Sequence, residues 1–454
     1  MNNIRIISLC GLVFFFAFFL GLYVYHAQVW PYTHFKEFIA FILGDAEENI
    51  SFKEKIKNDF NFKPSRHIKT AEEGSGRWLQ FSKGFESENH RELEGLKLNP
   101  RREKPRIFLS EKAPEGYRLI QGTFDFDEVL HGAILLDPEG KVKRVWHLSQ
   151  AGVDWEHQKD PNIFPHGLVI APDGSLVFAF DEGTTLTKYD YCGNIVWRIK
   201  GLFHHSISFE NENIIWVWKR RQYAWMDTAE ILVKVDYNTG KILKEIPLVK
   251  VMEANPDIDI FGMMQNDTPE GSNWAETTSG FWHANDIEPL TKKFEPYYPN
   301  FKAGDLLVSL RTPNLIFVMD QKSLKVKWWR QGLTRRQHDP DWNSSKGTIT
   351  IFNNNMHRGF SSIKEINPTT YEHRILLEGE KYDFYTWWRG KHQIMPTGGV
   401  LTTSSDQGRV FETDAKGNIT FEFINTYKKN QEYLVVSEAL FLPSSYFKAL
   451  PQCE

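Results

Sequence analysis

Five histidines recur along the chain, each just before a short run of residues with strand character. Imidazole can serve as a nucleophile, a general base or a metal ligand, and its ordinary pKa of about 6.5 keeps both protonation states accessible near neutrality. A repeat that returns one titratable side chain to the same point predicts that several imidazoles face one space. A single histidine of this kind is more often a hydrogen-bonded structural residue, so the prediction depends on the recurrence. The five are His166, His205, His283, His338 and His392.

An arginine and an asparagine accompany one of these histidines. Arg311 closes the run GDLLVSLR in the same unit as His283, and Asn285 follows that histidine by two residues. A planar guanidinium suits an anionic oxyacid group held by two hydrogen bonds, although such an arginine could equally take part in a surface salt bridge. The sequence contains no G-x-S-x-G elbow and no paired-carboxylate motif, so serine-hydrolase and glycosidase chemistry are not indicated. A metal site formed by the histidines is an open alternative.

Hairpins must position these side chains. Short strand-like runs are joined by turns in which Asp or Asn precedes Gly or Asn, the chemistry that tight turns require. ILVKVD-YNTG-KILKEI and RVFETD-AKGN-ITFEF are two examples, and the five histidines are separated by 39, 78, 55 and 54 residues. Units of about 40–50 residues with four strands each are typical of propeller blades.

The sequence therefore predicts an all-β fold, a six-bladed β-propeller. Five blades carry a histidine, and a first blade lies around Tyr117–Leu148. The longest interval contains Val249–Phe281, which is poor in strand pattern and is interpreted as an inserted loop rather than a hidden blade. Seven blades is the nearest alternative.

Four segments are expected along the chain. Residues 1–28 form an N-terminal transmembrane anchor, and residues 29–115 form a juxtamembrane amphipathic helix with a helical or irregular stalk. Residues 116–427 form the propeller domain, and residues 428–454 form a C-terminal tail that packs across the propeller base.

The predicted anchor is the apolar, uncharged run from Ile6 to Tyr25. At about 1.5 Å per residue it would span roughly 30 Å, the thickness of the bilayer hydrocarbon. A cleaved signal peptide is the alternative, but the run exceeds the usual apolar length of about 7–15 residues and no A-x-A cleavage site follows it. Arg5 favours a cytoplasmic N-terminus. We expect a single-pass protein of the cell inner membrane, with the propeller on the periplasmic or extracytoplasmic side.

Bulk composition excludes one class of partner and leaves the cysteines undecided. The net charge is −4, so no basic field indicates a nucleic-acid partner. The local cluster Lys219-Arg220-Arg221 could attract an anionic donor to the channel, and the favoured interpretation is a solvated turn. Cys192 and Cys453 are the two cysteines that could pair in a folded domain, and the sequence does not decide whether they do. No CxxC spacing indicates a cysteine-based metal site.

Three segments of the chain resemble the arylsulfotransferases, the PAPS-independent bacterial enzymes with a six-bladed propeller and a catalytic histidine. The first, QHDPDWNSSKGTITIFNN (Gln337–Asn354), is similar to the family's Q-H-x(n)-G-T-ϕ-x-ϕ-F-D-N-G run. The others are FWHANDIEP followed by GDLLVSLR, and the HHSIS step. The resemblance covers roughly residues 116–427, and it departs from the family where Asn353-Asn354-Asn355 replaces Asp-Asn-Gly.

The resemblance implies roles for individual side chains. His338 would be the nucleophile that becomes a sulfohistidine. His283 and Arg311 would bind and polarise the sulfuryl oxygens, and Asn285 would support them. His205 would be a further ligand or an acid/base. Arg311 and protonated histidines would stabilise the charge that develops on the sulfuryl oxygens and the leaving phenolate, commonly the largest catalytic effect.

Three further residues are expected to bind substrate, namely His166, His392 and Asn353. The reaction would need no cofactor and no metal. Aromatic side chains could line the mouth and stack an aryl or sugar group, or they could equally pack between blades. The candidates are Trp282, Trp342, Tyr385, Trp387 and Trp388.

The expected function is that of a membrane-anchored sulfotransferase. It would move a sulfuryl group from an aryl sulfate ester to a phenolic or glycan hydroxyl, with ping-pong kinetics through the sulfohistidine. Two alternatives stay open. One is a non-enzymatic propeller that binds an anionic glycan or a protein partner, and the other is a metal-dependent sulfate-ester hydrolase.

Overall fold

The structure is a computed structural model, and it divides into two compact units, Met1–Lys57 and Asn58–Glu454. The residues described are 77–80, 106–125, 129–149, 164–181, 183–220, 230–260, 282–343, 346–356, 359–386, 388–427 and 432–453. The expected anchor and almost all of the expected stalk lie outside these ranges. Among the described residues, no helix combines the length and the apolar character needed to cross a bilayer.

Four blades are each formed by four consecutive antiparallel strands. Blade 2 consists of β6 (Phe164–Ile170), β7 (Leu176–Asp181), β8 (Thr185–Tyr189) and β9 (Ile195–Lys200). Blade 3 consists of β10 (Leu202–Asn211), β11 (Ile214–Arg220), β12 (Glu230–Asp236) and β13 (Ile242–Pro247). Blade 4 consists of β14 (Ala284–Pro289), β15 (Leu306–Leu310), β16 (Leu315–Met319) and β17 (Val326–Gln331). Blade 5 consists of β18 (His338–Asn343), β19 (Thr348–Asn353), β20 (Ser362–Ile366) and β21 (His373–Glu378).

The first and last blades depart from this scheme. Blade 1 contains β3 (Gly116–Asp125), β4 (Val129–Leu136) and β5 (Val142–His147), and its remaining strand is β28 (Val436–Pro443). Blade 6 contains β22 (Lys391–Ile394), β23 (Val400–Ser404), β24 (Arg409–Thr413) and β25 (Ile419–Ile424). Two earlier strands, β2 (Arg106–Leu109) and β1 (Arg77–Gln80), extend blade 6 beyond β25. The short strands β26 (Thr426–Tyr427) and β27 (Glu432–Tyr433) pair with each other.

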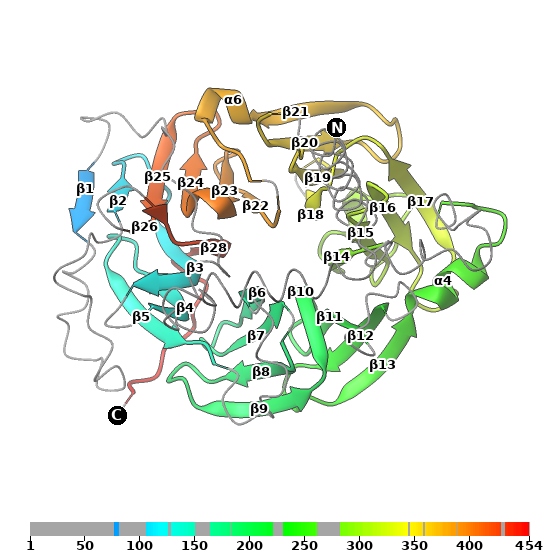
Figure 1. The fold of residues 1–454 in the computed structure, drawn as a ribbon, viewed down its shortest axis with the longest axis horizontal. Coiled ribbons are helices and arrows are strands. Elements are labelled where there is room, and N and C mark those ends of the chain that lie inside the picture. Colours follow the sequence, from blue (N-terminus) through cyan, green and yellow to red (C-terminus); the bar gives the residue numbers. More distant parts are fainter. Residues whose placement is uncertain are drawn as a thin grey trace, which may run out of the picture. The chain divides into compact units, whose positions relative to one another are not determined.

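These sheets form a ring whose inner strands are β28, β6, β10, β14, β18 and β22 (Figure 1). The predicted six-bladed propeller is thus confirmed, and the seven-bladed alternative is wrong. In the described part of the chain, four short helical segments accompany the strands. They are α4 (Leu248–Ala254), α6 (Gly379–Tyr382) and the 3-10 turns η5 (Glu295–Tyr297) and η6 (Ser405–Gln407). Helix α4 lies in the interval that was interpreted as an insertion between blades 3 and 4.

The hairpin turns form as their residue types require. The Asp236 carboxylate accepts the backbone N–H groups of Asn238 at 3.1 Å and Thr239 at 2.8 Å. Gly240 then adopts a φ of 71°, a left-handed conformation that glycine reaches without steric cost. An aspartate followed by a positive-φ glycine also makes the turn at Asp414 and Gly417. The short polar side chain replaces the hydrogen bonds that the turn withdraws from the ladder.

The sequence suggested that the C-terminal segment packs across the propeller base. The structure instead places part of it in a blade. Its strand β28 pairs with β3 from Val436 opposite Gly122 to Pro443 opposite Gly116, and it forms the inner strand of the first blade. The propeller therefore extends beyond the expected limits of 116–427 at both ends. The pairing of β28 with β3 closes the ring, because it joins strands from both ends of the propeller in one blade.

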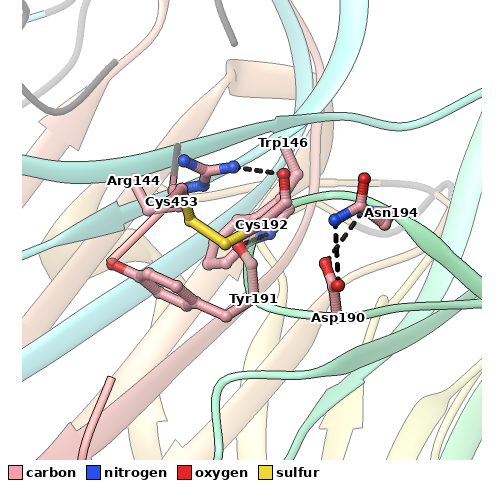
Figure 2. Close-up of a disulfide and its surroundings, with 7 residues drawn as sticks. All are labelled: Arg144, Trp146, Asp190, Tyr191, Cys192, Asn194 and Cys453. Atoms are coloured by element: carbon pink, nitrogen blue, oxygen red, sulfur yellow. Dashed lines mark hydrogen bonds between the residues drawn. A yellow bond between two sulfur atoms is a disulfide. The ribbon is translucent and has the colours of Figure 1, made fainter. Parts of the chain in front are cut away.

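Cys192 and Cys453 form a disulfide, a pairing that the sequence left undecided (Figure 2). Cys192 lies in the turn between β8 and β9, where the Arg144 guanidinium donates to its carbonyl and the Trp146 indole donates to the carbonyl of Tyr191. The bond joins positions 261 residues apart. It fastens the segment that follows β28 to blade 2.

Neighbouring blades pack face to face through apolar side chains. Trp218 and Leu232 of blade 3 lie in one buried cluster with Trp282 and Ala284 at the start of blade 4. Trp282 is fully buried there, so it belongs to the core and not to a substrate mouth. The same holds for Trp342, which packs among Tyr298 and other core residues. Of the remaining aromatic candidates, Trp387 lies outside the described residues.

Candidate active site

The candidate site lies where the inner strand of each blade begins. Because neighbouring strands run antiparallel, the end of the second strand meets the start of the first. Blades 2 to 5 therefore place two sets of side chains at the same level of the ring. The inner-strand starts contribute His166, His205, His283 and His338, and the second-strand ends contribute Asp181, Arg220, Arg311 and Asn354.

Four of the five histidines lie together. The ring centroids of His166 and His205 are 4.6 Å apart, and those of His205 and His283 are 5.2 Å apart. The ring of His338 lies 6.5 Å from that of His166. His283 is half-buried and the other three are buried. Imidazoles from four successive blades thus share one space.

The inner strands bulge where they carry these residues. Register shifts interrupt the pairing between His204 and Ile207 and between His338 and Pro340. His205 and His283 have φ values of 56° and 44°, a left-handed conformation that costs a residue with a side chain about 1–3 kcal/mol. The fold keeps this strain because the surrounding ladder fixes the backbone on both sides.

The repeat suggested that the histidines occupy equivalent positions in their blades. The bulges show that they do not. By pairing register, His338 corresponds to Ala284 of blade 4, one residue after His283. His392 forms a regular pair with Thr402. The blades therefore supply imidazoles to one space from offset backbone positions.

One ring nitrogen of His338 makes a hydrogen bond, and the other makes none with the described residues. Its Nδ1 lies 2.8 Å from Oδ1 of Asn354, and because an amide oxygen only accepts, Nδ1 carries the proton. The amide of Asn354 is itself fixed, since Nδ2 donates to the carbonyl oxygens of Thr386 at 3.0 Å and Arg389 at 2.6 Å. The neutral ring therefore presents a lone pair on Nε2, which has no hydrogen-bond partner among the described residues.

His166 follows the same arrangement with a carboxylate. Its Nδ1 lies 2.8 Å from Oδ2 of Asp181. Burial raises the pKa of Asp181, but the charges of His166 and Arg389 and the hydrogen bond from His166 outweigh burial and lower the pKa. Asp181 is therefore a carboxylate, and it also lies 3.5 Å from both His205 Nδ1 and Arg389 Nη2.

His205 is held by its chain neighbour. The Nδ1 atoms of His204 and His205 are 2.7 Å apart, and Nε2 of His204 lies 3.0 Å from Oε2 of Glu230. Arg220 donates from Nε to the other carboxylate oxygen of Glu230 at 3.0 Å. Arg220 is buried at the end of β11, so its interpretation as part of a solvated turn is wrong.

Arg311 is a half-buried cation without a carboxylate partner among the residues that the structure describes. Its backbone N–H donates to the carbonyl of His283 at 3.0 Å, which fixes the residue beside the histidines. The guanidinium Nη2 meets only Met356 Sδ at 3.7 Å, and Nε has no partner in the described part of the chain. Burial, and then the charge of Arg336, lowers the Arg311 pKa to about 10, so the group stays cationic at neutral pH.

Three of the histidines favour the neutral form, contrary to the expectation of protonated ones. Burial is the main cause that lowers the pKa of His338 well below 6.5, and the Arg311 charge adds to it. Burial and then Arg311 act in the same way on His283, and burial and then His166 act so on His205. Positive charge at the site thus comes from guanidinium groups, while the imidazoles keep their lone pairs.

The other three expected site residues form hydrogen bonds with groups other than the four clustered histidines. Asn285 Nδ2 donates to the carbonyl of Gln337 at 2.7 Å, so Asn285 positions the residue before His338. Its Oδ1 is buried without a partner among the described residues. Asn353 accepts from the Arg335 N–H at 2.8 Å and donates to Ser362 at 3.1 Å, so its side chain is engaged in local structure.

His392 lies next to the cluster but is fully engaged. Its Nδ1 is 2.9 Å from Asp339 Oδ2, and its Nε2 is 2.8 Å from the Thr350 hydroxyl. Lys391 Nζ contacts the same Asp339 carboxylate at 2.8 Å. A substrate role for His392 stays a prediction, and no unengaged nitrogen supports it.

Two donor sets have metal-ligand composition. In each set all ligand atoms lie within 4.8 Å of one another, and the sets are His166 with Asp181 and His205, and Asp339 with Asp341 and His392. In both, a cationic side chain, Arg389 or Lys391, already lies beside the aspartate. The first set shares two histidines with the candidate site.

The sequence reasoning missed five residues that hold the histidines in place. Two of them were within reach, since Asn354 is part of the quoted motif and His204 is the first histidine of HHSIS. The others lie at the end of β7, at the start of β12 and in the loop before β22, where the sequence shows no relation to a histidine. The five are Asp181, His204, Glu230, Asn354 and Arg389.

Comparisons with known proteins identify the family. The family model for arylsulfotransferase (ASST) matches residues 167–426, which is more than half of the chain and includes the site from Gly167 onward. Comparison with curated proteins gives no significant match.

Several solved structures are similar to this chain at low TM-scores. A protein of unknown function from Bacteroides caccae has a TM-score of 0.45 and 10% identity, over 72% of this chain and 98% of that one. The nidogen/laminin complex has a TM-score of 0.39 and 9% identity, over 71% and 99%. Virginiamycin B lyase from Staphylococcus aureus has a TM-score of 0.32 and 10% identity, over 57% and 69%. At these values the likenesses carry no argument about activity. The family match covers the blades that carry the site, and it shows that the chain belongs to the arylsulfotransferase family.

Proposed function

We propose that the protein transfers a sulfuryl group from an aryl sulfate ester to a hydroxyl acceptor through a sulfated His338. The observation that carries this proposal is the state of the His338 ring. Its Nδ1–H is fixed by Asn354 at 2.8 Å, its pKa is lowered by burial, and its Nε2 is unengaged among the described residues. A neutral imidazole with a positioned lone pair is a nucleophile that needs no activation by a separate base.

In the first half-reaction, the Nε2 lone pair of His338 attacks sulfur and the bond between sulfur and the phenolic oxygen breaks. The aryloxide leaves with the bonding electrons, and the ring keeps its Nδ1–H on Asn354. In the second half-reaction, an acceptor oxygen attacks the same sulfur, the S–N bond breaks, and its electrons restore the Nε2 lone pair. The acceptor loses its proton to a base, which returns the enzyme to its starting state.

Arg311 suits the charge that this transfer creates. Negative charge spreads over the sulfuryl oxygens and the leaving oxygen in the transition state. A half-buried guanidinium whose buried Nε lacks a partner in the described residues can donate to those oxygens. In a site shielded from water, fixed donors of this kind are commonly the largest contribution to catalysis. His283, whose backbone carbonyl binds the Arg311 N–H, would lie against the same group.

The expected location is also part of the proposal. A disulfide between Cys192 and Cys453 is typical of proteins in oxidising compartments, which supports an extracytoplasmic propeller. The apolar run from Ile6 to Tyr25 supports a single membrane anchor in the inner membrane. Phenols or glycan hydroxyls presented on that side would be the acceptors.

Intact-mass measurement tests the covalent step. After exposure to 4-nitrophenyl sulfate without an acceptor, the wild type should gain the mass of one SO₃ group, and His338→Asn should gain none. Turnover should fall in this variant by a factor of about 10³ or more, because the nucleophile is lost.

The alternatives give different results. A binding module would show no adduct and would bind sulfated ligands equally well after His338→Asn. A metal-dependent hydrolase would lose activity on chelation, whereas sulfuryl transfer to His338 should persist in EDTA. As a control, His373→Asn alters an exposed histidine on an outer strand and should leave adduct formation unchanged.

A further inference from the structure

Beyond the four clustered imidazoles, a buried chain of polar groups runs through blade 3 to one of them. Glu230 binds Nε2 of His204 at 3.0 Å, and Nδ1 of His204 lies 2.7 Å from Nδ1 of His205. Pairing register places Trp218 opposite both His204 and Leu232, and Arg220 opposite Glu230. These side chains therefore share the face of blade 3 that packs against blade 4.

The hydrogen positions along this chain follow from the acceptors. Burial raises the pKa of Glu230, but the charges of His204 and Arg220 outweigh it and lower the pKa, so Glu230 is a carboxylate. A carboxylate only accepts, and Nε2 of His204 must carry a proton. Two Nδ1 atoms at 2.7 Å share a single hydrogen, which belongs to one ring or the other.

The position of that hydrogen decides what the far side of His205 can do. When it is on His205, Nε2 of a neutral His205 is a bare acceptor. When it is on His204, a neutral His205 must carry its proton on Nε2 and becomes a donor. Nε2 of His205 has no hydrogen-bond partner among the described residues, and its ring lies 4.6 Å from His166 and 5.2 Å from His283.

We infer that Glu230 and His204 form a proton relay that lets His205 act as the acid and base of the proposed sulfuryl transfer. In the first half-reaction, Nε2–H of His205 gives its proton to the leaving aryloxide, and the shared hydrogen moves from His204 to His205. In the second half-reaction, Nε2 of His205 takes the acceptor's proton, and the shared hydrogen returns to His204. One proton enters and one leaves in each cycle.

The relay avoids placing a positive charge on His205. Burial, and then His166 and His204, lower the pKa of His205 well below 6.5. The ring therefore holds a positive charge poorly, although Asp181 Oδ1 lies 3.5 Å from its Nδ1. By moving the shared hydrogen, the protein puts the charge on His204, where the carboxylate of Glu230 stabilises it at 3.0 Å. His205 stays neutral in both states. His204 and Glu230 are thus positioning residues that act through His205.

The dependence of the rate on the leaving group tests the relay. A proton donor matters most when the leaving aryloxide is basic, so we compare phenyl sulfate with 4-nitrophenyl sulfate. Glu230→Gln and His204→Asn should each lower kcat/KM for phenyl sulfate by a factor of about 10 or more, in the range of general acid catalysis. The loss with 4-nitrophenyl sulfate should stay below about 3-fold, because a weakly basic leaving group needs little help.

The acceptor step gives a second readout. Enzyme loaded with sulfate by 4-nitrophenyl sulfate should pass the group to phenol at least about 10-fold more slowly in both variants, since the acceptor's proton has no relay to enter. The matched control is Glu412→Gln, which removes another buried carboxylate. Each oxygen of Glu412 accepts a hydrogen bond from Arg118 at 2.9 Å. It should lower stability without changing the ratio of the two donors.

The results distinguish the relay from the proposed function on which it rests. An equal loss with both donors in Glu230→Gln and His204→Asn would assign the pair a purely structural role and overturn the relay. Wild-type rates in both variants would overturn it as well. In either case a sulfate adduct on wild-type His338 would leave the proposed function standing, whereas a wild type that forms no adduct would overturn both.

Discussion

At the scale of single residues, three imidazoles of the site share one hydrogen-bond arrangement. His166, His205 and His338 each have Nδ1 held by a partner from their own or a neighbouring segment. The partners differ in kind: a carboxylate, another imidazole and an amide. An amide fixes the tautomer without adding charge, so the ring beside Asn354 is the one best suited to remain neutral. That ring belongs to the residue proposed as the nucleophile.

The charge of Arg311 should be visible in the titration of His338. Burial is the largest cause that lowers the His338 pKa, and Arg311 is the next. Removing a nearby positive charge makes protonation easier, so Arg311→Met should raise the His338 pKa, while burial still keeps it below 6.5. Two-dimensional NMR of ¹⁵N-histidine-labelled protein measures this directly.

The pH dependence of activity has a matching sign. Protonation of His338 removes the Nε2 lone pair, so wild-type adduct formation should stay constant as the pH falls to 6.5 and decline only at lower pH. Arg336→Met is the matched control, because it removes a neighbouring guanidinium that does not rank among the causes of the His338 shift. A larger shift in Arg336→Met than in Arg311→Met would contradict this assignment of charge.

At the scale of elements, the sequence predicted the parts that local chemistry decides. The D-x-x-G turns, the short strands and the number of blades all follow from short-range patterns, and the structure has them. The sequence did not predict the bulges, because a bulge depends on how two strands pair and not on either strand alone. Consequently the histidines were expected in equivalent positions, whereas His283 and His338 occupy different places relative to their second strands.

The bulge in β6 should be sensitive to a single methyl group. Gly167 has a φ of 105°, and a Cβ there would lie 1.9 Å from the carbonyl oxygen of His205. Gly167→Ala should lower the free energy of unfolding by about 3 kcal/mol or more, through backbone strain and the clash together. It should also reduce adduct formation, because the clash displaces His205. Urea denaturation and intact mass measure the two effects.

Gly359 provides the control, since its φ is 104° and nothing lies within 4 Å of a Cβ at that position. Gly359→Ala bears the conformational strain alone and should cost about 1 kcal/mol. Equal destabilisation by the two substitutions would show that the contact between blades 2 and 3 at this point is loose.

At the scale of the whole molecule, closure of the ring was beyond the sequence. The run VSEALFLP was assigned to a tail because its partner, β3, lies more than 300 residues earlier, and no local pattern connects the two. The pairing also explains why a tail so close to the chain end is ordered. Ser437 donates to Gln121 at 2.9 Å from within the inner strand, which ties the last strand to the first blade beside the central strands.

The disulfide should stabilise this closure. Cys453 follows β28 and is bonded to Cys192 of blade 2, so the bond keeps the closing strand attached when its pairing opens. Tyr446 and Lys448 add hydrogen bonds from the same segment to Ile170 and Pro172. Cys453→Ser should lower the free energy of unfolding by about 2–5 kcal/mol, the usual effect of removing a bond that closes a long loop.

Reduction of the wild type should give the same loss, and a reductant should have no further effect on Cys453→Ser. Urea denaturation with and without dithiothreitol measures both. Hydrogen exchange adds a local readout, since the amides of β28 should lose protection before those of β14 to β17, which no part of the C-terminal segment pairs with. If reduction instead weakened all blades equally, the last strand would be held by its pairing and packing alone, and the closure would not depend on the cysteines.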